Sequence, residues 1–149
     1  MTEKKPFAEW DCALACDFIK GWEGERFKAY QCVAGVWTIG VGHTEGVKPN
    51  DEITPEESHA LLLSDLYHFK KKVAPLVDVD VTEGQFIALM SFVFNVGVND
   101  FMTSTLRKRL NTGDLVQASF EFLKWKFAGG VIVKGLLKRR QAERELFDK

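Results

Sequence analysis

Residues 21–44 read GWEGERFKAYQCVAGVWTIGVGHT. From Gly24 to Val47 the chain holds five glycines among short runs of β-branched and aromatic residues. Glycine provides the tight turns that allow such short runs to fold back on one another as strands. The composition therefore predicts a small, strongly turned β-sheet in this part of the chain.

An amphipathic helix is predicted before this stretch. Trp10, Leu14 and Phe18 recur every four residues, which places them on one face of a helix. This spacing predicts a helix over about 8–21. Glu23 then follows directly after the helix, beside the glycine-rich stretch.

A second helix is predicted after the sheet. Thr54 can cap a helix that begins at Pro55, and Glu57 is placed to complete a capping box with Thr54. Apolar residues continue at helical spacing toward Pro75, where a helix must end. We expect a helix over about 55–74 that is long enough to join two lobes.

The remaining chain is predicted to be helical. Thr82 and Gln85 repeat the capping pattern before FIALMSFVFNVG, which is apolar nearly all round and closes at Gly97. Such a helix is normally surrounded by others. Further helices are predicted over about 104–111, 115–126 and 136–147. The sequence thus predicts an α+β fold, mainly helical, with a small β-sheet lobe at about 22–55 joined by a long helix to a helical lobe at about 80–149, which also takes in helix 8–21.

Composition limits the possible functions. The chain has 149 residues, which suits a single domain, and a net charge of −1, which gives no overall attraction to nucleic acid. No run approaches the roughly 18 apolar residues that a membrane span needs, and acidic residues interrupt the start where a signal peptide would be apolar. Three cysteines without framework spacing argue against a disulfide scaffold, and Cys12 and Cys16, one helical turn apart, are expected in the core.

Several residues in the glycine-rich stretch could support chemistry. Glu23 lies beside Trp22, and an adjacent aromatic ring can desolvate a carboxylate so that it serves as an acid. Cys32 and His43 could form the nucleophile and base of a cysteine protease, although such a pair occurs in many chains. The three histidines lack the spacing of metal ligands, and GVGHTEG lacks the Lys of a phosphate-binding loop.

The whole stretch GWEGERFKAYQCVAGVWTIGVGHT resembles the signature of the phage lysozymes, glycoside hydrolase family 24. The similarity continues through TPEESHALLLSDL, ALMSFVFNVGVNDFMTSTLRKRLNTGD and GLLKRRQAERELF, and so covers nearly the whole chain in the family's order. The resemblance implies a single lysozyme-like domain over 1–149. It also implies hydrolysis of the β-1,4 bond between N-acetylmuramic acid and N-acetylglucosamine in peptidoglycan.

The resemblance also assigns site residues. The family's catalytic Glu, Asp and Thr fall on Glu23, Cys32 and Thr38, so a cysteine replaces the usual aspartate. Glu23 would protonate the leaving oxygen, while Cys32 and Thr38 would hold the attacking water. Alternatively, Cys32 would attack as a thiolate and give retention. Arg139 matches the family's arginine that pairs with the catalytic Glu.

Other positions matching the family are expected to line the cleft or to support it. Phe94 and Thr105 fall where family members line the cleft, whereas His43 and Trp37 are expected to stabilise the small lobe. No cofactor and no metal are implied. Two alternatives stay open: a lytic transglycosylase that uses only Glu23, and an inactive relative that only binds peptidoglycan.

The resemblance finally implies where the protein acts. We expect a monomer without stable membrane insertion, made in the host cytoplasm without a signal peptide. It would depend on a holin to reach the cell wall from the periplasm and lyse the host.

Overall fold

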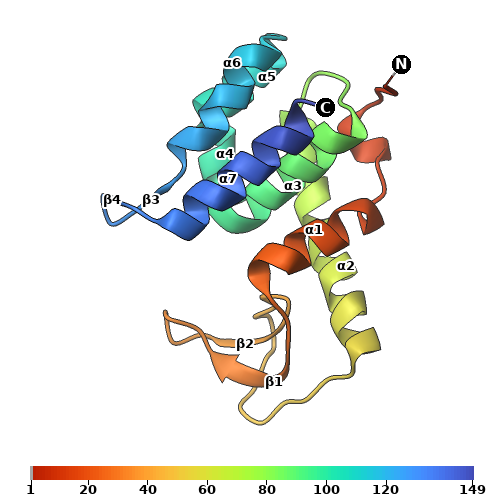
Figure 1. The fold of residues 1–149 in the computed structure, drawn as a ribbon. Helices are drawn as coiled ribbons and strands as arrows, with labels where there is room; N and C mark the ends of the chain where they lie inside the picture. The colour runs from red at the N-terminus through yellow and green to blue at the C-terminus, as the bar shows by residue number, and fades with distance from the viewer. Residues whose placement is uncertain (1) are drawn as a thin grey trace.

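The computed structural model describes residues 2–149 and confirms the predicted α+β fold class. A small sheet lies at one end of the molecule and a group of helices at the other, with α2 running from the sheet region into the helical group (Figure 1). The α-helices are α1 (Ala13–Glu23), α2 (Pro55–Val73), α3 (Glu83–Val96), α4 (Val98–Thr103), α5 (Thr105–Asn111), α6 (Leu115–Glu121) and α7 (Lys134–Phe147). The strands are β1 (Arg26–Gln31), β2 (Trp37–Gly40), β3 (Phe127–Ala128) and β4 (Val131–Ile132).

The sheet predicted from the glycine-rich stretch is formed by β1 and β2. The two strands are antiparallel, with Tyr30 opposite Thr38, and their register shifts between Arg26 and Tyr30. Such an irregularity bends a strand and increases its twist. The backbone N–H of Cys32 donates to the Val36 carbonyl at 3.0 Å and closes the turn between the strands. Cys32 therefore lies where the sheet folds back on itself.

Helix α2 begins as its sequence predicts. The Thr54 hydroxyl accepts a hydrogen bond from the Glu57 N–H at 3.1 Å, and the Glu57 carboxylate accepts one from the Thr54 N–H at 3.0 Å. A cap of this kind contributes about 1 kcal/mol to helix stability. The helix ends at Val73, two residues before Pro75. Its buried Leu66 joins the core of the helical lobe, so α2 anchors the small sheet to that lobe.

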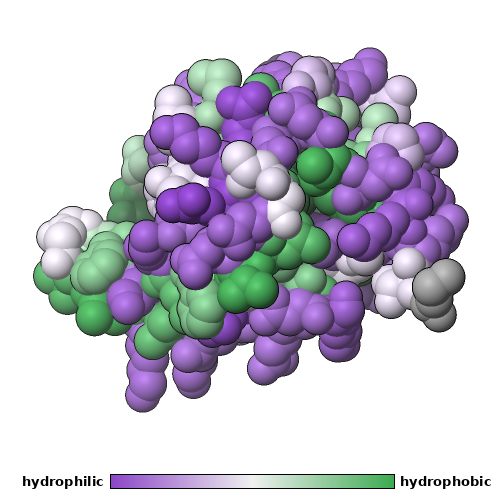
Figure 2. Space-filling model, turned by 90° about the horizontal axis from the view of Figure 1, so that it is seen from above, coloured by the Kyte–Doolittle hydropathy of each residue, from purple (hydrophilic) through white to green (hydrophobic). Residues whose placement is uncertain are grey.

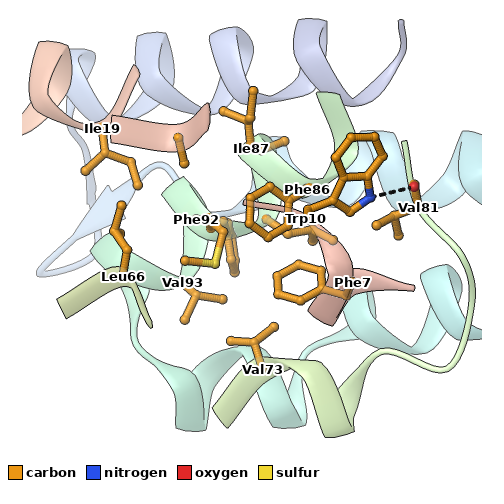
Figure 3. Packing of buried hydrophobic residues seen from close by; sticks show 14 of the residues in the cluster. Phe7, Trp10, Ile19, Leu66, Val73, Val81, Phe86, Ile87, Phe92 and Val93 are labelled. Atoms are coloured by element: carbon orange, nitrogen blue, oxygen red, sulfur yellow. Dashed lines mark hydrogen bonds between the residues drawn. The ribbon is translucent and has the colours of Figure 1, made fainter. Parts of the chain in front are cut away.

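Helix α3 is the centre of the helical lobe. Its residues from Gln85 to Val93 are all buried, and the helix packs against both α1 and α7. The Phe7 and Phe86 rings lie 4.9 Å apart, and the Trp10 indole donates to the Val81 carbonyl at 3.0 Å (Figure 3). Burial of each large apolar side chain contributes roughly 1.5–3 kcal/mol. This core holds α1 and α7 in place against α3.

The helix predicted over about 8–21 is wrong at both ends. Phe7–Glu9 form a separate 3₁₀ turn, and α1 begins only at Ala13, whose N–H donates to the Asp11 carboxylate at 2.9 Å. The helix then runs on to Glu23. The apolar spacing persists across the break because both segments cover the same core, so spacing alone does not reveal the break.

The last third of the chain also differs from the prediction. The helix predicted over 115–126 stops at Glu121 and continues as a 3₁₀ turn over Phe122–Lys124. A hairpin of β3 and β4 follows, which the sequence analysis missed together with α4. Gly129 and Gly130 form its turn with φ values of 58° and 79°, a conformation that glycine adopts without strain.

Hydrophilic residues cover most of the face seen in Figure 2, whereas hydrophobic residues gather toward its left side, where Figure 1 places the β3–β4 hairpin. Phe127, Val131 and Ile132 of this hairpin are each more than half exposed. Within residues 2–149, none of the helices combines the length and the hydropathy that crossing a membrane requires.

Candidate active site

Glu23 is the last residue of α1 and points to the junction of the two lobes. Gly24 ends the helix with a φ of 77°, a left-handed value that favours glycine. The Glu23 side chain is 23% exposed. The Trp22 ring next to it lies edge-on to Phe18 and is 37% exposed. The surroundings of the carboxylate come from α7 and from the turn after β2.

Arg139 approaches Glu23 from α7, 116 residues later in the chain. Its Nη1 lies 2.5 Å from Glu23 Oε2, and the arginine side chain is only 5% exposed. The ion pair that the family resemblance implies is therefore present. A charge-assisted hydrogen bond of this kind fixes the direction of the carboxylate as well as its position.

The turn after β2 brings its backbone close to the acid. Gly42 has a φ of 68°, and a Cβ atom added there would lie 3.9 Å from Glu23 Oε1 and 3.7 Å from Phe94 Cε1. A carboxylate, an aromatic ring and a bare backbone thus converge. Beside them is a cleft of about 410 Å³ between the lobes, lined by Gly42, His43, Thr44, Glu45, Asp65, Phe69, Lys72 and Phe94.

Cys32 and Thr38 lie together on the small sheet. Cys32 directly follows β1 and is partly exposed, while Thr38 in β2 is buried and its hydroxyl donates to the Val36 carbonyl at 2.9 Å. Hydrogen bonds from the backbone N–H groups of Val36 and Ala34 hold the pKa of the Cys32 thiol below its ordinary value. The turn, rather than a nearby cation, therefore favours the thiolate.

His43 does not have the geometry of a base for Cys32. Its Nδ1 lies 2.8 Å from Asp65 Oδ2 on α2, and its Nε2 lies 2.9 Å from the Glu45 carbonyl oxygen. With both ring nitrogens engaged, His43 ties the turn after β2 to α2. Among residues 2–149, no cluster of three or more His, Cys, Asp or Glu side chains is arranged to hold a metal ion.

Thr105 and Trp37 are not among the residues that line the cleft beside Phe94. Thr105 is the exposed first residue of α5. Trp37 lies in β2, opposite Gln31, and is partly buried. Cys12 and Cys16 are buried in the core, as their spacing suggests.

Two residues that contact Arg139 were missed. Ser91 and Glu143 are both fully buried and lie against its guanidinium. Two signals in the sequence could have identified them. Ser91 is the one residue with a hydroxyl group in the apolar run FIALMSFVF. Glu143 follows Arg139 by four residues, so Arg139 and Glu143 lie on the same face of a helix.

A carboxylate that pairs with a buried arginine, placed between a small sheet lobe and a helical lobe, is the arrangement expected of a glycoside hydrolase of the lysozyme type. The chain belongs to the phage lysozyme family, because the sequence profile described as "Phage lysozyme" matches residues 20–143. It is 46% identical over 134 residues to an endolysin of Acyrthosiphon pisum secondary endosymbiont phage 1, which covers 87% of this chain and 92% of the relative.

Solved structures agree with this assignment. The muramidase domain of SpmX from Asticaccaulis excentricus aligns with a TM-score of 0.85 and 34% identity, over 91% of this chain and 95% of that domain. A mutant of P22 lysozyme aligns over the full length of both chains with a TM-score of 0.79 and 36% identity.

Proposed function

We propose that this chain is a phage endolysin with muramidase activity, and that Glu23 is its general acid. It hydrolyses the β-1,4 bond between N-acetylmuramic acid and N-acetylglucosamine in bacterial peptidoglycan and so lyses the host. The observation that supports this most is the placement of the Glu23 carboxylate, which pairs with Arg139 and lies near Gly42 and Phe94, two residues that line the cleft between the lobes. Relatives named as endolysins and as a muramidase domain support the same reaction.

Glu23 would give its proton to the glycosidic oxygen as the bond to the anomeric carbon breaks. On the small sheet, Cys32 and Thr38 would hold the water that attacks this carbon, and a Cys32 thiolate would accept a proton from it. The lowered pKa of the Cys32 thiol supports this role. The same thiolate could instead attack the anomeric carbon, and water activated by ionised Glu23 would then release the sugar with retention.

The proposal also covers the domain organisation of the protein, the place where it acts and the residues that would contact the glycan. Residues 1–149 would act as one lysozyme-like domain and as a monomer. The protein would be made in the host cytoplasm and reach the wall in the periplasm with the help of a holin. Phe94 and Thr105 would contact the glycan, Phe94 from the wall of the cleft and Thr105 from its exposed position at the start of α5.

The test compares Glu23→Gln with the matched control Glu25→Gln on purified sacculi. Glutamine keeps the shape of the side chain but has no proton to transfer, so Glu23→Gln is expected to reduce lysis at least about a hundredfold. Glu25 pairs with Lys20 and Ser58 instead, and its replacement should leave lysis within about twofold. Both variants should show the circular dichroism spectrum of the folded protein.

Mass analysis of the products separates the possible reactions. Reducing-end sugars indicate hydrolysis, whereas anhydro ends would indicate a lytic transglycosylase that uses only Glu23. An absence of products from the unmodified protein would indicate a peptidoglycan binder. Lysis by Glu23→Gln at the rate of the unmodified protein would remove Glu23 from the mechanism.

A further inference from the structure

The Arg139 guanidinium is held on three sides inside the helical lobe. Nη1 meets Glu23, Nη2 donates to the Ser91 carbonyl at 3.1 Å, and Nε donates to the Ser91 hydroxyl at 3.3 Å. Ser91 lies on α3 and is fully buried. The arginine therefore cannot turn away from Glu23 without breaking two bonds to α3.

Glu143 completes this arrangement one helical turn after Arg139. Its Oε2 accepts a hydrogen bond from the Ser91 hydroxyl at 2.6 Å and lies 3.4 Å from Arg139 Nε. Because the Ser91 proton is given to Glu143, the lone pairs of the same hydroxyl are free to accept from Arg139. Glu143 thus sets the direction of the Ser91 hydroxyl, which in turn holds the guanidinium.

Arg140 is a second buried arginine that contacts Glu143. It pairs with Glu143, with Nε 2.7 Å from Oε1, and its guanidinium lies 5.1 Å from the centre of the Phe92 ring. Burial raises the pKa of the Glu143 carboxyl, and Arg140 opposes this shift most strongly. In formal charges, two arginines and one glutamate amount to a net charge of +1, and Arg139 is the arginine of this group that contacts Glu23.

Stability alone gives little reason for such a network. A buried ion pair loses about as much free energy to desolvation as it gains from attraction, and apolar side chains often serve a core equally well. A network of this kind can, however, fix the position of a charged side chain such as Arg139, and so fix the group with which that side chain pairs. Here that group is the acid.

We infer that Ser91 and Glu143 are positioning residues for the reaction: they hold the Arg139 guanidinium against the Glu23 carboxylate and do not contact the glycan themselves. The inference rests on the proposed role of Glu23 as general acid. Both residues are fully buried, so their loss should change the turnover step and leave glycan binding unchanged.

The first test compares Ser91→Ala with Ser119→Ala. Ser119 is also buried and also accepts a hydrogen bond from an arginine of α7, since Arg144 Nε donates to its hydroxyl at 2.9 Å. It lies away from Glu23 and serves as the matched control. On a soluble glycan oligomer we expect Ser91→Ala to lower kcat about fivefold with KM within about twofold, and Ser119→Ala to leave both constants within twofold. Equal kcat for the two variants at equal folded fraction would overturn the inference.

The second test is a double-mutant cycle between Glu143→Gln and Arg139→Ala. If Glu143 acts through Arg139, Glu143→Gln should lower kcat about tenfold alone and by less than about twofold when Arg139 is already alanine. Independent, multiplicative losses would mean that Glu143 does not act through Arg139. If Glu143→Gln does not fold, the Ser91 and Ser119 pair alone decides.

Glu23→Gln measured on the same oligomer separates this inference from the proposed function. Full turnover by Glu23→Gln would defeat the proposed function itself. Loss of turnover in Glu23→Gln, together with unchanged kcat in Ser91→Ala, would defeat only the positioning role.

Discussion

Gly84→Ala should destabilise the protein although alanine is the better helix former. Gly84 is the second residue of α3, where that helix crosses α7. A Cβ atom added at Gly84 would lie 2.2 Å from the Leu146 carbonyl oxygen of α7, whereas real Cβ atoms are essentially never closer than 3.0 Å. The obstacle is backbone, so no rotamer change can relieve it. The two helices would have to move apart.

The expected magnitude follows from two opposing effects. Replacing glycine by alanine in a helix gains up to about 1 kcal/mol. Overpacking of this kind costs about 1–3 kcal/mol. Because the obstacle is backbone at 2.2 Å, the upper part of this range, about 2–3 kcal/mol, applies. The net loss should then be about 1–2 kcal/mol, or roughly 2–8 °C in Tm for a protein of this size.

Gly21→Ala is the matched control. Gly21 lies inside α1 with nothing within 4 Å of an added Cβ, so alanine there should raise Tm by about 1–4 °C. Thermal unfolding followed by circular dichroism measures both variants. Equal shifts in Tm for the two variants, or a rise for Gly84→Ala, would refute the packing argument.

Three further predictions concern single side chains. Cys32→Asp should remain active because a carboxylate can also hold water, whereas Cys32→Ala should lose most activity. Equal rates of lysis by Cys32→Ala and the unmodified protein would show that the sulfur of Cys32 takes no part in the reaction. Iodoacetamide at pH 8 should modify Cys32 first, since burial raises the pKa of Cys16 to about 11 and also raises that of Cys12; peptide mass analysis should find the label on Cys32 as lysis falls. The hydrogen bond from the Ser58 hydroxyl is the main cause that lowers the pKa of Glu25 in the folded protein, so Glu25→Gln should reduce Tm at pH 7. This difference in Tm should vanish as the pH falls from about 4.3, the pKa of an unfolded glutamate, through the lower pKa of Glu25 in the folded protein. A difference in Tm that persists at pH 2 would refute this account of Glu25.

Local signals in the sequence were sufficient where one motif fixes one structure. The Thr54 and Thr82 capping boxes are both present, because each needs only four neighbouring residues to form. The turned sheet at Cys32 follows from glycines whose positive φ values few other residues adopt. The start of α1 could not be predicted in the same way, since the 3₁₀ turn before α1 and α1 itself both pack on the core of the helical lobe and share one apolar spacing.

At the active site too, contacts between distant parts of the chain could not be predicted from the sequence. The candidate acid and its arginine could be assigned from family positions, but the contacts around them join residues far apart in the chain. Ser91 and Glu143 are brought together by the packing of α3 on α7, which no short pattern specifies.

The site joins the two ends of the fold. Glu23 ends the first α-helix, Arg139 lies on the last, and α3 packs against both helices and contributes Ser91. The acid therefore reaches its arginine only when α1, α3 and α7 have packed together. The small sheet brings Gly42 against the carboxylate and is held to α2 by the His43–Asp65 pair. Errors in packing at a distance, such as the displacement of α7 expected for Gly84→Ala, should thus reach the acid through Arg139 and lower turnover as well as stability.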